Sequence, residues 1–98
     1  MSNQTVWPAV TSLAIQYIEL AERENAVCML RITNATVVVS MSVDPTAEDS
    51  PETADWQPST PYTADETIVL SGSDGRFFKL EITANTGAVT LHMAKRRV

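Results

Sequence analysis

The stretch VCMLRIT at 27–33, followed by TVVVSMSV at 36–43, decides the fold. Apolar and polar side chains alternate in both segments, and Cys28, Leu30 and Ile32 share one face of the first. Alternation with a period of two is typical of a strand that buries one face. The segments FFKLEIT at 77–83 and AVTLHM at 88–93 alternate in the same way. The sequence therefore predicts an all-β protein.

The connections between these segments are typical of turns. Asn34-Ala35 is expected to link two strands, and the sequence ANTG at 84–87 predicts a tight hairpin loop in which Gly87 takes a positive φ. Residues 12–20 fit either a helical face or a strand, and we favour a strand because an all-β remainder needs a partner there. With a shorter strand at 67–70, about seven short antiparallel strands predict a single β-sandwich, immunoglobulin-like or jelly-roll.

The chain has 98 residues, which is enough for one domain. We expect an extended arm at 1–11, outside any strand, a sandwich over 12–94 and a basic tail at 95–98. A long connection at 44–66 interrupts the sandwich and contains seven carboxylates, four prolines and no Lys or Arg. Connections of this length are often functional, and a short strand is predicted inside it at 56–57.

Charge and hydropathy argue against two classes of partner. The net charge of −5 gives no overall attraction to nucleic acid or to an anionic membrane. No apolar run approaches the roughly 20 residues that a membrane span needs, and the first five residues lack the pattern of a signal peptide. We therefore expect neither nucleic acid nor membrane as a partner, and no export by a signal peptide.

Few residues could carry catalysis or hold a metal. The single cysteine, Cys28, falls on an apolar face and the single histidine, His92, on a polar one, so no nucleophile–base pair is expected. Zinc would need more Cys and His ligands than the chain has. The acids from Asp44 to Asp55 lack the ligand spacing of a known calcium loop, so a solvated loop is preferred and calcium stays an alternative. The sequence predicts no enzyme, no cofactor and no metal.

The remaining candidates concern contact surfaces. Aromatic residues beside prolines in predicted loops can anchor a neighbouring protein, and a basic tail could dock on an acidic neighbour. Two alternatives stay open: Trp56 could fold back on the chain's own sandwich, and the tail could be a solvated terminus. The candidate partner-binding residues are Trp7, Pro8, Trp56, Pro61, Tyr62, Lys95, Arg96 and Arg97.

The order of strands and turns over 12–94, including GSDGRFFKLEIT at 72–83 and NTGAVTL at 85–91, resembles the small β-sandwich structural proteins of tailed bacteriophages. These are capsid decoration (cement) proteins or modules of tails and fibres. The resemblance implies a non-enzymatic virion protein that is made in the host cytoplasm and binds the major capsid protein or another virion protein. It also implies a homo-oligomer, with a trimer favoured. The long acidic connection departs from the family pattern.

Two other functions remain open beside a decoration protein. The first is a receptor- or carbohydrate-binding module of a phage tail or fibre, in which Trp56 and Tyr62 form a stacking platform. The second and weaker one is a small hydrolase.

Overall fold

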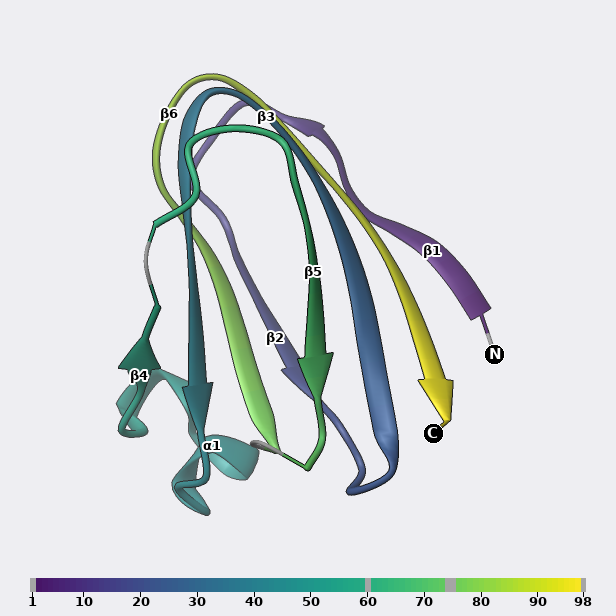
Figure 1. Ribbon diagram of the computed structural model, residues 1–98. Coiled ribbons are helices and arrows are strands. Elements are labelled where there is room, and N and C mark those ends of the chain that lie inside the picture. The colour runs from purple at the N-terminus through teal and green to yellow at the C-terminus, as the bar shows by residue number, and fades with distance from the viewer. Residues whose placement is uncertain (1, 60, 74–75, 98) are drawn as a thin grey trace.

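The computed structural model describes residues 2–59, 61–73 and 76–97, and its strands form one antiparallel sheet that folds over on itself (Figure 1). The strands are β1 Ser2–Val10, β2 Ile15–Glu19, β3 Glu24–Ser42, β4 Gln57–Pro58, β5 Glu66–Ser71 and β6 Phe77–Arg97. A helix α1 Thr46–Asp49 and a 3-10 turn η1 Pro51–Thr53 lie between β3 and β4. None of the described helices is long and apolar enough to cross a membrane.

β3 and β6 form the frame of the fold. They pair antiparallel from Glu24 opposite Arg97 to Ser42 opposite Phe77, and both bend about midway along this ladder (Figure 1). The bend falls where the register shifts, after Thr33, and Asn34 there takes a left-handed φ of 50°. An extra residue in one strand breaks the ladder locally and bends it, which is the effect of a β-bulge.

The bend divides the sheet into two layers. The first half-sheet contains residues 24–33 and 88–97, flanked by β5 on the β3 side and β1 on the β6 side. The second contains residues 37–42 and 77–82, flanked by β4 and β2 in the same order. The molecule is thus a sandwich whose two central strands run through both layers.

The core lies between the half-sheets and follows the predicted alternation. Burial of such side chains contributes about 1.5–3 kcal/mol each. The largest fully buried side chains are Leu20, Cys28, Leu30, Val37, Leu80, Ile82, Val89 and Leu91.

The all-β antiparallel class is confirmed, and so is a strand within 12–20, which is β2. The short strands predicted at 27–33 and 36–43 are one strand, β3, and the two predicted between 77 and 93 are parts of β6. The predicted hairpin loop at 84–87 is therefore wrong, because this segment is the bend of β6.

Gly87 has no positive φ in the structure. The position favours glycine for another reason: a Cβ there would collide with the carbonyl oxygen of Thr33 on the neighbouring strand. Close approach of two backbones explains this glycine.

Both predicted terminal segments are strands instead. β1 pairs with β6 from Ser2 opposite Lys95 to Val10 opposite Val89, so the expectation of an unpaired arm at 1–11 is wrong. The basic residues at 95–97 are the end of β6 and pair with Ala26, Asn25 and Glu24; Val98 lies outside the described residues. β3 pairs with all three of these residues, and β1 pairs with Lys95 on the other side.

Candidate functional site

Residues 44–59, which we call the lid, fold back over the outer face of the second half-sheet (Figure 1). Ser40 and Ser42, two polar residues of that face, are buried because the lid covers them. The Ser42 hydroxyl donates to the carbonyl oxygen of Asp55 at 2.6 Å and accepts from the amide of Asp44 at 3.0 Å. The predicted acidic loop thus carries α1, η1 and β4, and the short strand expected at 56–57 is β4, one residue later.

Asp44 ties the two ends of the lid together. Its carboxylate accepts hydrogen bonds from the amide of Asp55 at 2.9 Å and from the amide of Thr46 at 3.0 Å. These bonds, the one from Asp55 first, hold the pKa of the Asp44 carboxyl below its ordinary value. Within residues 2–59, 61–73 and 76–97, no group of three or more His, Cys, Asp and Glu is arranged to hold a metal ion.

Trp56 folds back on its own sheet, which was the alternative to its anchoring a neighbouring protein. Its indole nitrogen donates to the carbonyl oxygen of Pro51 at 2.8 Å. Its ring stacks on Tyr17 with 6.0 Å between centroids, and the ammonium of Lys79 lies 5.0 Å from the ring centroid. Sequence reasoning missed Tyr17 and Lys79, whose outward position on β2 and β6 follows from the strand alternation once β2 is accepted.

Trp56 and Tyr62 do not share one platform. Trp56 lines a hollow of about 160 Å³ with Tyr17, Phe77, Glu19 and Glu48. Tyr62 instead exchanges backbone hydrogen bonds of 2.8 and 2.9 Å with Val37 and packs against the core. Pro61, beside it, is exposed.

Trp7 is 5% exposed and lies in the chain's own core, opposite Leu91. The prediction that it projects from an arm to reach a neighbour is therefore wrong. A free indole ring would leave a large apolar surface in water, and β1 brings this ring to the core between two register shifts. Pro8, next in the strand, is exposed.

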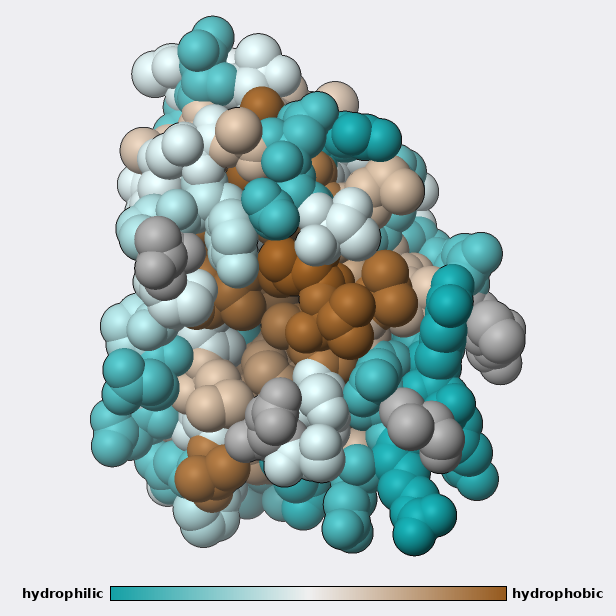
Figure 2. All heavy atoms as spheres, viewed as in Figure 1, coloured by the Kyte–Doolittle hydropathy of each residue, from teal (hydrophilic) through white to brown (hydrophobic). Residues whose placement is uncertain are grey.

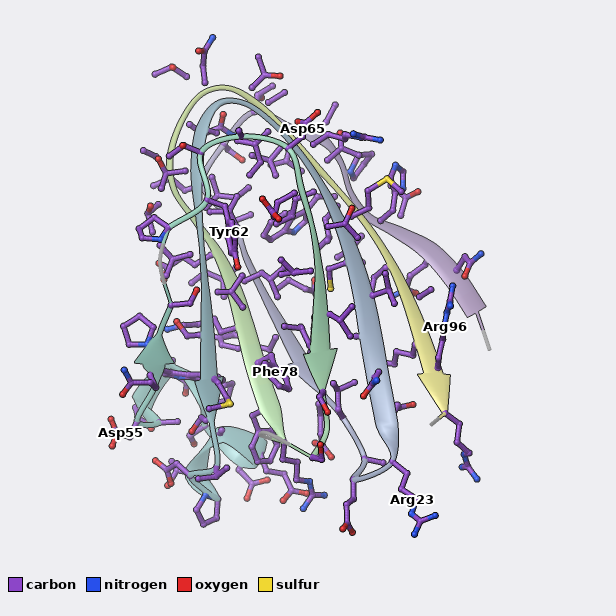
Figure 3. All side chains as sticks on the ribbon, in the orientation of Figure 1. Arg23, Asp55, Tyr62, Asp65, Phe78 and Arg96 are labelled. Atoms are coloured by element: carbon purple, nitrogen blue, oxygen red, sulfur yellow. The ribbon has the colours of Figure 1, made fainter. Side chains whose placement is uncertain are left out.

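The cations at the end of β6 differ in their surroundings. The Lys95 ammonium donates to the carbonyl oxygen of Glu19 at 3.2 Å. Arg96 and Arg97 are exposed, and Figure 3 shows Arg96 at the edge where β6 meets β1. These two remain candidates for contact with an acidic surface.

Cys28 and His92 lie on opposite faces of the first half-sheet, as predicted. Cys28 is fully buried, and burial raises the pKa of its thiol to about 11. His92 is exposed, and its Nδ1 lies 3.0 Å from the Thr5 hydroxyl. The thiol is protonated at neutral pH and is not positioned to react with the imidazole.

Apolar side chains reach the surface in two places at opposite edges of the sheet, although of the described large hydrophobic residues only Val69 is largely exposed in the first. At the β3 edge, a groove of about 310 Å³ opens between β4 and β5. Figure 2 shows apolar residues gathered here, and Figure 3 shows Tyr62 and Phe78 on this side. The groove is lined by Met41, Tyr62, Ile68, Val69, Leu70 and Phe78, among others.

At the β6 edge, an apolar row follows β2. Leu13, Ile15 and Tyr17 alternate along it and are 64%, 47% and 38% exposed. Sequence reasoning placed these residues on a strand but gave no sign that they face water, because the alternation looks the same on either face.

Comparison with protein-family models, with curated proteins and with solved structures gives no match.

Proposed function

We propose that the chain is a non-enzymatic structural protein of a phage particle, a capsid decoration protein. It is made in the bacterial host cytoplasm and binds the major capsid protein or another virion protein in many copies. Its contacts are with protein, and neither nucleic acid nor membrane is a partner.

The observation that supports this proposal is the pair of apolar areas at opposite edges of the sheet. Contiguous exposed apolar patches mark interaction sites. A protein that clamps a shell needs one contact with the shell and another with its neighbours. The apolar row of Leu13, Ile15 and Tyr17 is suited to the shell contact, and the groove beside β5 to the contact with a neighbour.

Charge adds a second argument about the partner. The chain as a whole carries −5. A shell surface that accepts it should therefore be apolar with a basic rim, and its affinity should fall as salt rises.

Binding to heads of the source phage tests the proposal. The tagged chain is mixed with heads lacking it and sedimented through a gradient; we expect a fixed number of copies per head. Ile15→Ser should lower that binding about tenfold, because it removes one apolar contact worth about 1–2 kcal/mol. Val43→Ser is the matched control, since Val43 is 73% exposed and lies outside both areas. The absence of co-sedimentation with heads would refute the proposal.

A second candidate function, a carbohydrate- or receptor-binding module, is favoured by the aromatic hollow on the lid side. Tyr17 and Trp56 offer ring surface there, and Glu19 and Glu48 offer acceptors for hydroxyl groups. Titration with a panel of bacterial surface sugars, followed by Trp fluorescence, tests it. Saturable quenching that Tyr17→Ala abolishes and Tyr62→Ala leaves intact would favour this module over the decoration protein.

A further inference from the structure

β5 is an open edge strand of the sheet. Six consecutive residue pairs, from Glu66 opposite Leu30 to Ser71 opposite Asn25, join it to β3 without a register shift. Within the part of the chain that the structure describes, no strand pairs with its other edge. Edge strands in natural proteins carry Lys, Pro or a bulge that prevents pairing. β5 has none of these, whereas β1 has Pro8 and two register shifts.

The alternation of hydrogen bonds shows which backbone groups face outward. The amide of Gly72 donates to the carbonyl oxygen of Glu24 at 2.8 Å, one register position beyond Ser71 opposite Asn25. In an antiparallel pair every second residue bonds to the partner strand. The even-numbered residues of β5 therefore bond to β3. The amide and carbonyl groups of Thr67, Val69 and Ser71 point away from β3, toward the open edge.

The sequence of β5 is nearly symmetric about Val69. Ile68 and Leu70 flank it with apolar side chains, and Thr67 and Ser71 follow with hydroxyls. A contact between two identical copies across a two-fold axis must be complementary to itself. An antiparallel pair centred on this valine satisfies that condition from Thr67 to Ser71.

We propose that two copies of the chain associate through their β5 edges, antiparallel, with the two-fold axis at Val69. Val69 then lies opposite the partner's Val69, and Thr67 opposite the partner's Ser71. Each copy donates three hydrogen bonds from its outward amides to outward carbonyl groups of the partner, so six hydrogen bonds join the two strands. The first half-sheet of one copy and the first half-sheet of the other then form one continuous sheet.

Burial and local charge both support a second copy as the occupant. Val69 is 60% exposed in the single chain and would pack against its equivalent. On the inner side, Ile68 meets the partner's Leu70 at the mouth of the apolar groove. Glu66, the charged residue of β5, lies opposite the partner's Gly72, so no acid faces an acid across the strand pair.

The solution mass of the purified chain tests the contact. We expect a dimer at tens of micromolar by light scattering, and a monomer for Val69→Lys, because two ammonium groups would meet at the axis and weaken association at least about 100-fold. Val43→Lys, the same change at another exposed valine, should remain a dimer. A monomeric natural chain, or a dimer that persists in Val69→Lys, would overturn the proposal. A trimer, as the family resemblance implied, would also overturn it.

Cysteine crosslinking tests the register. Paired residues across an antiparallel ladder have Cα atoms about 5.5 Å apart, within disulfide range. Val69→Cys should therefore form a covalent dimer on mild oxidation. Thr67→Cys should not, since Thr67 and the partner's Thr67 would lie roughly 14 Å apart along the strands. Cys28 is buried in both variants and does not compete. Efficient crosslinking of Thr67→Cys alone would contradict this register.

The response to added salt distinguishes dimer formation from binding to a shell. Two bodies of −5 repel each other, so added salt should strengthen the dimer. Binding to a basic shell surface should weaken under the same change. The inference goes beyond the proposed function and needs only the chain itself, so failure of either leaves the other testable.

Discussion

Asp44 shows how a single carboxylate holds a long connection. A carboxyl whose pKa is lowered in the folded state stabilises it above the unfolded pKa, and this stabilisation is lost as the pH falls through the folded pKa. Because hydrogen bonds from Asp55 and Thr46 lower the pKa of Asp44, we expect the lid to loosen below about pH 4.

Asp44→Asn should loosen the lid at neutral pH, since an amide has one acceptor oxygen in place of two. The measurement is amide hydrogen exchange at Thr46 and Asp55, which should become faster in the variant. Asp49→Asn is the control, an exposed acid of the same lid. Unchanged exchange at both amides in Asp44→Asn would show that the lid is held by other contacts.

Trp7 carries the largest single share of packing on β1. Trp7→Ala should destabilise the fold by about 3–5 kcal/mol, as truncation of a buried aromatic side chain generally does. Trp56→Ala should cost less, because Trp56 is only half-buried. Urea unfolding of both variants measures the difference. Equal losses of unfolding free energy would contradict the placement of Trp7 in the core.

At the scale of an element, the bend of β3 and β6 depends on two residues. Gly87→Ala should destabilise the fold by about 1–3 kcal/mol, because the new methyl group meets the backbone of Thr33 and the strands must separate. Asn34→Gly should be nearly neutral, since glycine accepts the left-handed φ of this position. Thermal unfolding of both proteins gives the comparison. A stable Gly87→Ala variant would show that the two strands can part at the bend.

The same bend is the part of the fold that could not be predicted from the sequence. Alternation predicted the strands and their inward faces, such as Cys28, Leu30 and Ile32, because a period of two is a local property. Asn34 and Gly87 are typical of turns and of bulges alike. Whether the chain reverses or only bends there depends on layers brought together from distant segments. Sequence alone could not decide between the two.

The candidate contact surfaces were predicted less well than the strands. β1 was missed because Pro8 and two register shifts interrupt its alternation. The TIVLS segment of β5 was recognised in part as a strand. Its open edge depends on the absence of a neighbouring strand, which no local pattern encodes. Exposure of Leu13 and Ile15 likewise depends on which face of β2 is covered.

At the scale of the whole molecule, β1 is an integral part of the sandwich. A chain lacking residues 1–9 should lose its cooperative thermal transition, because the deletion removes Trp7 and uncovers the β6 edge. Circular dichroism during heating measures this, with a chain shortened by two residues as the control. A truncated chain that melts cooperatively near the natural temperature would show that β1 only rests on a complete fold.

The pairing of Ser2 with Lys95 places both ends of the chain at one end of the same strand pair (Figure 1). A pulling force applied across the two ends would load the hydrogen bonds between β1 and β6 one after another, not all at once. β1 would therefore peel away at low force and expose Trp7, while the ladder between β3 and β6 stays closed. A tether through its termini would be mechanically weak. Contacts along the strand edges would spread the same load over many bonds.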